Sequence, residues 1–365
     1  MVRVALIGAG SIALQNHAPG IATHPEGRLV ALCDPDPGAL ERASQATGIT
    51  RTYTDYRAVL DQDDIDAVVI TTPNHLHAPI ATAAVAAGKH VMCEKPIGMT
   101  YEEAQGMAEA AERAGVVHMT AFTYRFVPAI RYMERLVGGG SLGVLYHLRS
   151  RRLQDWGDRA VGWRQVKALA GTGEIGDMLS HRIDYAHYLI GPIERLVAQT
   201  RQCLAERRRP DGSIEPSDVE DWVALLGELK GGVTGVFESS KMATGRGSGG
   251  QAEDFLEING SGGTLIYYLN RPHEILIGSP GGSLVPTPVP EDCLKVPGSP
   301  RDPRAGDPLQ GFRYDQSFEL IQAIVEGRAA SPDFRDGARA QAVMDAVLLS
   351  AERRQWVDVP GATIL

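Results

Sequence analysis

Three side chains with acid–base chemistry stand in two short stretches that are otherwise largely apolar or rich in glycine. Lys95 follows an apolar run at residues 91–93 in "VMCEKPIGMT" and precedes a proline. Because proline lacks an amide hydrogen and fixes its own φ, it ends regular strand pairing. We therefore predict that Lys95 lies at the tip of a strand. Its ammonium group can enter a cleft there, or it can be an ordinary solvated charge at a strand end.

The other two side chains, Asp177 and His181, belong to "GTGEIGDMLSHRIDYAHYLIG". The flanking glycines predict a helix from about residue 176 to 190, and Asp177, His181 and Asp184 share one face of it. A helical His beside a carboxylate can accept a proton, which indicates an acid–base pair. Two alternatives remain: a solvated polar face, or a metal site, for which Asp-x₃-His supplies only two good ligands.

The elements that must position these side chains divide the chain into two parts. Residues 1–122 alternate short apolar runs with helical patterns, which predicts an α/β Rossmann domain with a doubly wound parallel sheet. Residues 123–365 contain long strand-like runs with turns at 230–232 and 260–263, and two late helices. This predicts an α+β domain with a large, mostly antiparallel open sheet. We interpret the proline-rich stretch 279–308 as a long loop.

A dinucleotide fingerprint, "GAGSIA", lies between the first predicted strand and the first helix. Gly8 permits a tight turn, and Gly10 lets the backbone approach a pyrophosphate. Asp34 ends the second strand about 20 residues later, where its carboxylate can bind the ribose hydroxyls of NAD and repel the 2′-phosphate of NADP. We therefore expect NAD, with NADP less favoured. The predicted contacts in this loop are Gly8, Gly10, Ser11 and Ile12.

A polar corner follows the strand at about residues 66–72. Carboxyl ends of parallel strands are where doubly wound sheets bind ligands, so we expect cofactor contacts there. The residues concerned are Thr71, Thr72, Pro73, Asn74 and His77. The histidines of this corner lack a Cys or carboxylate at metal-binding spacing, and we predict no metal site in the chain.

Charge and hydropathy exclude several classes of partner. The net charge of −9 and the pI near 5.6 argue against nucleic acid, which requires a clustered basic surface. No apolar run approaches the roughly 18–20 residues of a membrane span, and no signal peptide is visible. We therefore expect a cytoplasmic protein.

Several motifs together resemble the Gfo/Idh/MocA family of oxidoreductases. They are "GAGSIA", "TTPNHLH", "CEKP", "YRFVPAIRYMERLVGGGSLG", the predicted helix with its flanking glycines, and the closing "FRDGARAQAVMDAVLLSAERRQWVDV". The resemblance covers essentially the whole chain. Within the family, "RLQDW", "GWRQVKALAGTG" and "VVHMTAFTYR" look most like levoglucosan dehydrogenases and related sugar 3-dehydrogenases.

The resemblance implies roles for individual residues. Lys95 of the Glu-Lys-Pro motif would be the catalytic lysine, His181 the proton acceptor, and Asp177 the residue that orients substrate and lysine. Residues similar to the family's cofactor-side positions are Asn74, His77, Glu94, Arg125, Trp163 and Arg164. Gln154 and Asp155 are candidate contacts to a sugar, and Trp156 could stack on its ring.

We accordingly expect an NAD-dependent dehydrogenase that oxidises a secondary hydroxyl, at C3, of a sugar, anhydrosugar or cyclitol. One alternative is a glycoside-cleaving enzyme that works through a transient 3-keto sugar and regenerates its NAD. Another is an NAD-binding protein without catalysis. Relatives often assemble through the large sheet, so we expect a homodimer or homotetramer. In this scheme residues 1–122 bind NAD, and residues 123–365 bind substrate and form the oligomer.

Overall fold

The computed structural model describes residues 1–157, 159–209, 211–246 and 252–362. The chain forms two compact units. Unit 1 contains Met1–Phe126 and Lys295–Ala338, and unit 2 contains Val127–Leu294 and Arg339–Leu365. The sequence pattern predicted a single boundary after residue 122. The structure differs because the chain returns, so that residues 295–338 pack with the first 126.

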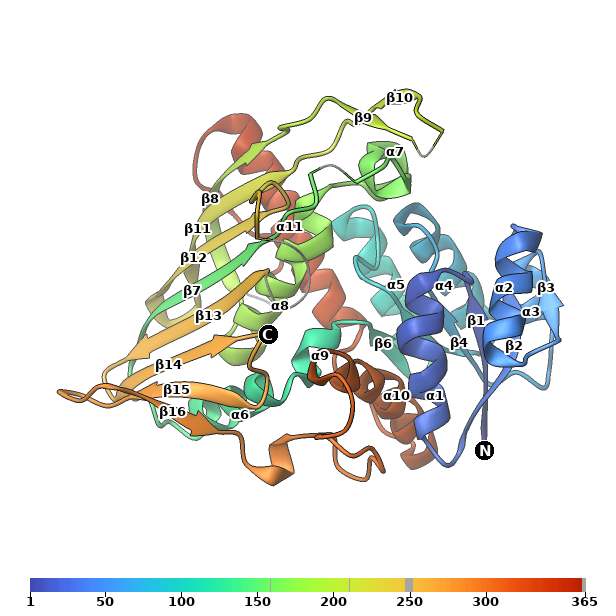
Figure 1. Ribbon diagram of the computed structural model, residues 1–365, viewed down its shortest axis with the longest axis horizontal. Helices are drawn as coiled ribbons and strands as arrows, with labels where there is room; N and C mark the ends of the chain where they lie inside the picture. Colours follow the sequence, from blue (N-terminus) through green and yellow to red (C-terminus); the bar gives the residue numbers. More distant parts are fainter. Residues whose placement is uncertain (158, 210, 247–251, 363–365) are drawn as a thin grey trace. The chain divides into compact units, whose positions relative to one another are not determined.

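Unit 1 is built on a six-stranded parallel sheet in the order β3-β2-β1-β4-β5-β6, which confirms the predicted doubly wound topology (Figure 1). Its central strands β1, β4 and β5 are mostly apolar and buried, as a sheet covered on both faces requires. The strand order reverses between β1 and β4, which is where such sheets bind ligands. The strands are β1 (Val2–Ile7), β2 (Gly27–Cys33), β3 (Thr52–Tyr53), β4 (Ala67–Ile70), β5 (His90–Cys93) and β6 (His118–Thr120).

Short capping signals set the helix ends in unit 1. Asp36, Asp55 and Thr100 each accept a hydrogen bond from a backbone amide of the first turn, and Gly48 and Gly115 end helices in the left-handed conformation. The helical segments of the first part are η1 (Ala13–His17), α1 (Ala18–Thr23), α2 (Pro37–Thr47), α3 (Tyr56–Leu60), η2 (Asn74–Leu76), α4 (His77–Ala86), α5 (Tyr101–Ala114) and η3 (Thr123–Phe126).

The returning segment adds α9 (Pro308–Gly311), η9 (Phe312–Tyr314) and α10 (Asp315–Glu326) to unit 1. Helix α10 packs beside α1 and touches β1 (Figure 1). The close approach depends on glycine: a Cβ at Gly27 would lie 2.6 Å from Cδ1 of Ile321. Burial of Phe318 and Ile321 against the first strands explains why this segment belongs to unit 1.

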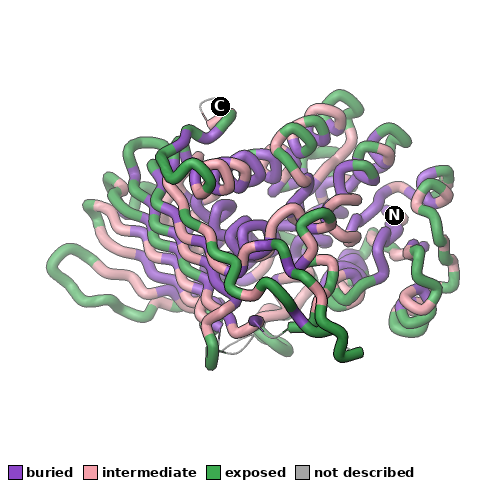
Figure 2. The backbone as a smooth tube through the Cα atoms, turned by 90° about the horizontal axis from the view of Figure 1, so that it is seen from above, coloured by how far each residue is buried: buried purple, intermediate pink, exposed green. Residues whose placement is uncertain are grey.

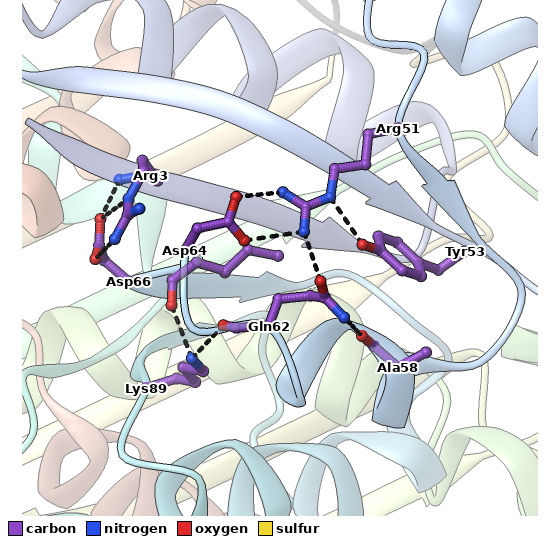
Figure 3. A network of polar contacts seen from close by, with 9 residues as sticks. Arg3, Arg51, Tyr53, Ala58, Gln62, Asp64, Asp66 and Lys89 are labelled. Carbon is purple, nitrogen blue, oxygen red and sulfur yellow. Dashed lines mark hydrogen bonds and ion pairs between the residues drawn. The ribbon is translucent and has the colours of Figure 1, made fainter.

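A polar network ties together the starts of the strands in unit 1 (Figure 3). Arg3 of β1 pairs with Asp66 at 2.7 Å, and Arg51 pairs with Asp64 at 2.7 Å. The Lys89 ammonium donates to the carbonyls of residues 62 and 65, at 2.7 and 2.9 Å. We call this set the amino-edge network; its members are Arg3, Arg51, Gln62, Asp64, Asp66 and Lys89.

Unit 2 is built on a mixed sheet of nine described strands in the order β16-β15-β14-β13-β7-β12-β11-β8-β17 (Figure 1). Only β7 and β12 pair in parallel, so the predicted mostly antiparallel sheet is confirmed. The strands are β7 (Leu145–Leu153), β8 (Ile193–Arg201), β11 (Trp222–Leu229), β12 (Val233–Ser240), β13 (Glu253–Gly260), β14 (Gly263–Tyr268), β15 (Glu274–Gly278), β16 (Leu284–Pro288) and β17 (Val357–Asp358).

Two local features of this sheet bear on the sequence predictions. Both predicted hairpins are present, β11–β12 and β13–β14, because their glycine turns and alternating patterns are local signals. The proline-rich stretch 279–308 is not all loop, since it contains β16. Strand β16 pairs only with β15 and lies at the edge of the sheet, where proline costs no interior ladder bond. A separate hairpin joins β9 (Glu206–Arg208) and β10 (Ile214–Pro216).

Helices cover one face of the large sheet. They include α6 (Pro128–Gly138), η5 (Ile175–Leu179) and α8 (Ser180–Leu189). The other short helical segments of this part are η4 (Trp163–Gln165), α7 (Lys167–Ala170), η6 (Lys230–Gly232) and η8 (Glu291–Cys293). Helix α8 contacts β7 and β8, and η5 contacts β11 and β12. Figure 2 shows buried positions running along these strands and through the covering helices. Helix α11 (Phe334–Arg353) begins in unit 1 and ends in unit 2.

Candidate active site

The glycine loop after β1 is fixed by its neighbour across the sheet. Gly8 has φ +100°, and a Cβ there would lie 2.7 Å from the carbonyl carbon of Thr71. Only glycine fits this position. A Cβ on Gly10, by contrast, would meet nothing within 4 Å, and both Gly10 and Ser11 are exposed. The loop is therefore rigid at its base and open at Gly10, as a loop that admits a phosphate must be.

Asp34, directly after β2, is held by two backbone amides. Its Oδ2 accepts from the Ala9 amide at 2.8 Å, and its Oδ1 accepts from the Asp36 amide at 2.9 Å. A carboxylate has about four acceptor positions, so capacity remains for two ribose hydroxyls. The open Gly10 and this anchored carboxylate together fit a dinucleotide.

The polar corner after β4 packs against the glycine loop. The Thr71 hydroxyl donates to the Gly8 carbonyl at 2.6 Å, Thr72 and Pro73 are half-buried, and Asn74 is buried at the start of η2. His77 is buried, with Nε2 2.9 Å from the Thr72 carbonyl and Nδ1 2.6 Å from the Pro96 carbonyl. Burial lowers the pKa of His77, although both carbonyls oppose this shift. Both ring nitrogens of His77 thus contact backbone carbonyls of the protein.

The Glu-Lys-Pro corner follows β5, as predicted. The Glu94 amide donates to the Ile70 carbonyl at 2.9 Å, and the Lys95 amide lies 3.3 Å from Glu94 Oε2. Lys95 is half-buried, and the peptide bond to Pro96 is cis. Lys95 therefore lies at the carboxyl edge of the sheet, in the same row of loops as Gly8 and Thr71.

Arg125, another predicted cofactor-side residue, is buried in η3. Its guanidinium pairs with Asp336 at 3.1 Å, and that carboxylate also accepts from the Asp333 amide. The returning segment 295–338 thus holds Arg125 within unit 1. Asp336 lies about 210 residues from Arg125 in sequence, and no local pattern indicated the pair.

The predicted helix of unit 2 is present as η5 and α8. It opens with a π-turn, a feature found often at functional sites. His181 is only 4% exposed and Asp184 2%, and Asp177 is half-buried. The alternative of a solvated polar face is therefore wrong, because His181 and Asp184 are almost completely buried.

A carboxyl group that the sequence analysis missed lies just before this helix. Glu174 is fully buried; its Oε1 accepts from the Ser239 hydroxyl at 2.5 Å, and its Oε2 lies 3.9 Å from the Lys241 ammonium. Burial and the nearby Asp177 charge raise the Glu174 pKa to about 8, against the influence of Lys241 and Ser239. A Glu at a helix start is usually solvated, so no sequence signal marked this one as buried.

The predicted sugar contacts follow β7. Gln154 is fully buried, and within the described part of the chain neither atom of its side-chain amide has a hydrogen-bond partner. A buried amide without partners is costly. Asp155 is half-buried, and its Oδ2 accepts from the Gly245 amide at 2.7 Å.

Arginines stack on the two tryptophans singled out in this region. The Arg159 guanidinium lies 3.6 Å from the ring centre of Trp156, and that of Arg164 lies 4.2 Å from the ring centre of Trp163. One face of Trp156 is thus covered, so a sugar ring could stack only on the other. Trp163 is half-buried and Arg164 exposed.

Among the residues with described positions, no group of three or more His, Cys, Asp or Glu side chains could hold a metal ion. No helix in the described ranges is both long and apolar enough to cross a membrane.

Two family profiles match the chain. Residues 2–122 match the profile described as an oxidoreductase family with an NAD-binding Rossmann fold, and residues 130–266 match the GFO/IDH/MocA C-terminal domain. Levoglucosan dehydrogenase of Pseudarthrobacter phenanthrenivorans is 32% identical, over 92% of this chain and 90% of its own. Inositol 2-dehydrogenase of Rhizobium meliloti is 28% identical, over 97% and 98%.

A solved structure gives the same result. Levoglucosan dehydrogenase in complex with NADH and levoglucosan superposes with a TM-score of 0.89, at 31% identity, over 98% of this chain and 99% of the other. Profiles, sequence identity and fold agree over nearly the full length. The chain therefore belongs to the Gfo/Idh/MocA family of oxidoreductases.

Proposed function

We propose that the chain is an NAD-dependent dehydrogenase that oxidises a secondary hydroxyl, at C3, of a sugar, anhydrosugar or cyclitol. One observation carries the proposal. The chain is similar to levoglucosan dehydrogenase over nearly its full length, and its sequence carries both Glu94-Lys95-Pro96 and Asp177-x₃-His181. Their settings support it, because Lys95 ends a strand of the nucleotide fold and His181 is sheltered from bulk water.

The proposed mechanism gives each side chain one task. When bound, NAD⁺ would supply the acceptor for the hydride that leaves the carbon of the alcohol. His181 accepts the hydroxyl proton, so that an alcohol and NAD⁺ give a ketone, NADH and one proton. Lys95 donates a hydrogen bond to the hydroxyl oxygen and stabilises the negative charge that develops there. Asp177 orients the substrate and the lysine.

On the cofactor side, we propose that the backbone at Gly8 and Gly10 approaches the pyrophosphate and that Asp34 accepts from the adenosine ribose. The negative charge of Asp34 favours NAD over NADP. The other proposed cofactor residues are Ser11, Ile12, Thr71, Thr72, Pro73, Asn74, His77, Glu94, Lys95, Arg125, Trp163 and Arg164. His77 would act by holding the loops, since its ring nitrogens contact protein carbonyls.

On the substrate side, we propose that Gln154 and Asp155 bind sugar hydroxyls beside Lys95, Asp177 and His181.

A substrate panel tests the function. Purified protein is assayed with levoglucosan, a glucoside and an inositol, with NAD and NADP in parallel, while NADH and the sugar products are measured. We expect NADH to accumulate together with a keto sugar, and faster with NAD. Bond cleavage without net NADH would indicate the glycoside-cleaving alternative, and NAD binding without turnover of any sugar would indicate a non-catalytic protein.

We also propose that the chain assembles as a homodimer or homotetramer through the large sheet. Leu226 and Val236 are direct cross-strand partners in β11 and β12, yet they are 50% and 45% exposed. Light scattering of the wild type and of Leu226→Glu would test assembly: we expect an oligomer that the charged residue weakens, and a monomeric wild type would contradict it.

A further inference from the structure

A buried histidine that the proposed function does not use contacts the Glu-Lys-Pro corner. His17 ends η1, the π-turn after the glycine loop, and is fully buried. Its Nε2 lies 2.9 Å from Glu94 Oε1, and its Nδ1 lies 3.3 Å from the Ser317 hydroxyl. We infer that His17 is a positioning residue that fixes Glu94 and, through it, Lys95. The inference rests on the proposed role of Lys95.

The two contacts of His17 define its tautomer. A carboxylate can only accept, so Nε2–H donates to Glu94. In a neutral imidazole the other nitrogen is then an acceptor, and the Ser317 hydroxyl donates to Nδ1. Ser317 therefore selects the tautomer in which His17 points its hydrogen at Glu94.

The partner serine comes from the returning segment. Ser317 lies on α10, and a Cβ at Gly20 of α1 would be 3.0 Å from Ser317 Cβ and from the carbonyl of Tyr314. Helix α10 can therefore approach His17 because α1 carries glycine at this position. A line of contacts runs from α10 through His17 and Glu94 to the backbone amide of Lys95, which lies 3.3 Å from Glu94 Oε2.

The contact between His17 and Glu94 also affects the pKa of Glu94. Burial alone would raise the Glu94 pKa, but the hydrogen bond from His17, together with electrostatic contributions from Lys95 and His77, lowers it. Two of these groups come from opposite sides: His17 from η1, and His77 from α4, where it also holds the Pro96 carbonyl. Without His17, burial would favour the protonated acid, and the corner would lose both its anchor and its negative charge.

A matched pair of histidines makes the inference testable. His24, which directly follows α1, is also buried, and its Nε2 lies 2.8 Å from Gln322 Oε1 on α10. His17 and His24 flank α1 at its two ends and each contacts α10, but Glu94 is not among the described contacts of His24. His24→Ala therefore controls for loosening of the α1–α10 packing.

For His17→Ala we expect kcat on the best sugar to fall about 10–100-fold, as for a misplaced catalytic group, with KM for NAD changing less than about twofold. The acid limb of the kcat profile should move to higher pH, because the Glu94 pKa rises. His17→Gln should recover part of the rate, since its amide can donate to Glu94. His24→Ala should lose thermal stability but keep kcat and the pH profile.

A readout without turnover separates this inference from the proposed function. In protein labelled with ¹³C-glutamate, with the Glu94 signal assigned through Glu94→Gln, we expect the Glu94 pKa to rise in His17→Ala and to stay unchanged in His24→Ala. An unchanged Glu94 pKa and unchanged kcat in His17→Ala would overturn the inference, as would an equal loss of kcat in His24→Ala. A wild type that oxidises no sugar, yet shows this pKa change, would overturn the proposed function and leave the contact standing.

Discussion

The two edges of the parallel sheet in unit 1 are stabilised by different kinds of contact. At the amino edge, charges pair with charges or with several carbonyls: Arg3 with Asp66, and Lys89 with two carbonyls (Figure 3). At the carboxyl edge, the loops that carry Gly8 and Lys95 are held by buried imidazoles, a glycine and backbone amides.

This difference indicates that the amino edge of the sheet contributes mainly to stability and the carboxyl edge mainly to ligand binding. In the amino-edge network, the charged groups bind each other or nearby backbone carbonyls, and these contacts stabilise the fold. At the carboxyl edge the fixed groups are backbone and histidine, so the acceptor capacity of Asp34 and the open space at Gly10 are kept for a ligand. Substitutions at the two edges should therefore affect different measurements.

The largest expected effect is on turnover at the carboxyl edge. Lys95→Ala should lower kcat by about 10²–10⁴, as for loss of a group that acts in the transition state, with NAD affinity nearly unchanged. His181→Ala, in unit 2, should match it. Steady-state kinetics and NAD titration by fluorescence check this, and full activity in both variants would refute the catalytic assignment.

Two glycine substitutions in the loop after β1 separate its effect on stability from its effect on NAD binding. Gly8→Ala forces a side chain into the Thr71 carbonyl at φ +100°, and should lower the free energy of unfolding by about 2–5 kcal/mol. Gly10→Ala meets no protein atom, so it should leave stability within about 0.5 kcal/mol and weaken NAD binding. Denaturant unfolding and NAD titration of both variants measure the difference; equal NAD affinity in Gly10→Ala would argue against phosphate binding there.

At the amino edge, stability should change without turnover. Lys89→Met leaves two carbonyls without their donor and should lower the free energy of unfolding by about 1–3 kcal/mol, while kcat stays within about twofold of wild type. Lys230→Met, at an exposed turn, is the control and should change neither. A large loss of kcat in Lys89→Met would break the proposed division between the edges.

The smallest expected effect at neutral pH is on stability, and it concerns two carboxyl groups whose pKa values are shifted in opposite directions. The Arg3 hydrogen bond lowers the Asp66 pKa, whereas burial raises that of Glu174 to about 8. Because the folded state favours protonated Glu174, its stabilising contribution is complete below about pH 4.5 and is lost as pH rises through about 8. The Tm of Glu174→Gln minus the Tm of wild type should therefore be a few °C larger at pH 9 than at pH 5. Melting curves across this pH range measure it, and parallel curves would contradict the raised pKa.

Local patterns predicted much of the fold. The apolar strands of unit 1, the glycine fingerprint and the two hairpin turns each carry their signal within a few residues, and all are present. The return of residues 295–338 to unit 1 depends on contacts between distant segments, which no window of sequence contains. Strand β16 pairs with the neighbouring strand β15, but its prolines hid the strand pattern.

The candidate site also contains residues that local patterns indicated and residues whose setting depends on distant contacts. Spacing was enough to select Lys95, Asp177 and His181 for chemistry. It could not distinguish a buried His181 from a solvated one, because the sheet that covers α8 lies elsewhere in the chain. Glu174 and His17 were missed for the same reason: their partners, Ser239 and Ser317, lie 65 and 300 residues away.

Transfer of a carbon-bound hydrogen to NAD is the central claim, and isotope transfer tests it most directly. Purified protein is given NAD and the best sugar of the panel, deuterated at its hydroxyl-bearing carbons, and the reduced cofactor is analysed by mass spectrometry. We expect one deuterium in each NADH formed, one keto sugar per NADH, and almost none of either with Lys95→Ala. Reduced cofactor without deuterium, or sugar consumed without accumulation of reduced cofactor, would contradict the account.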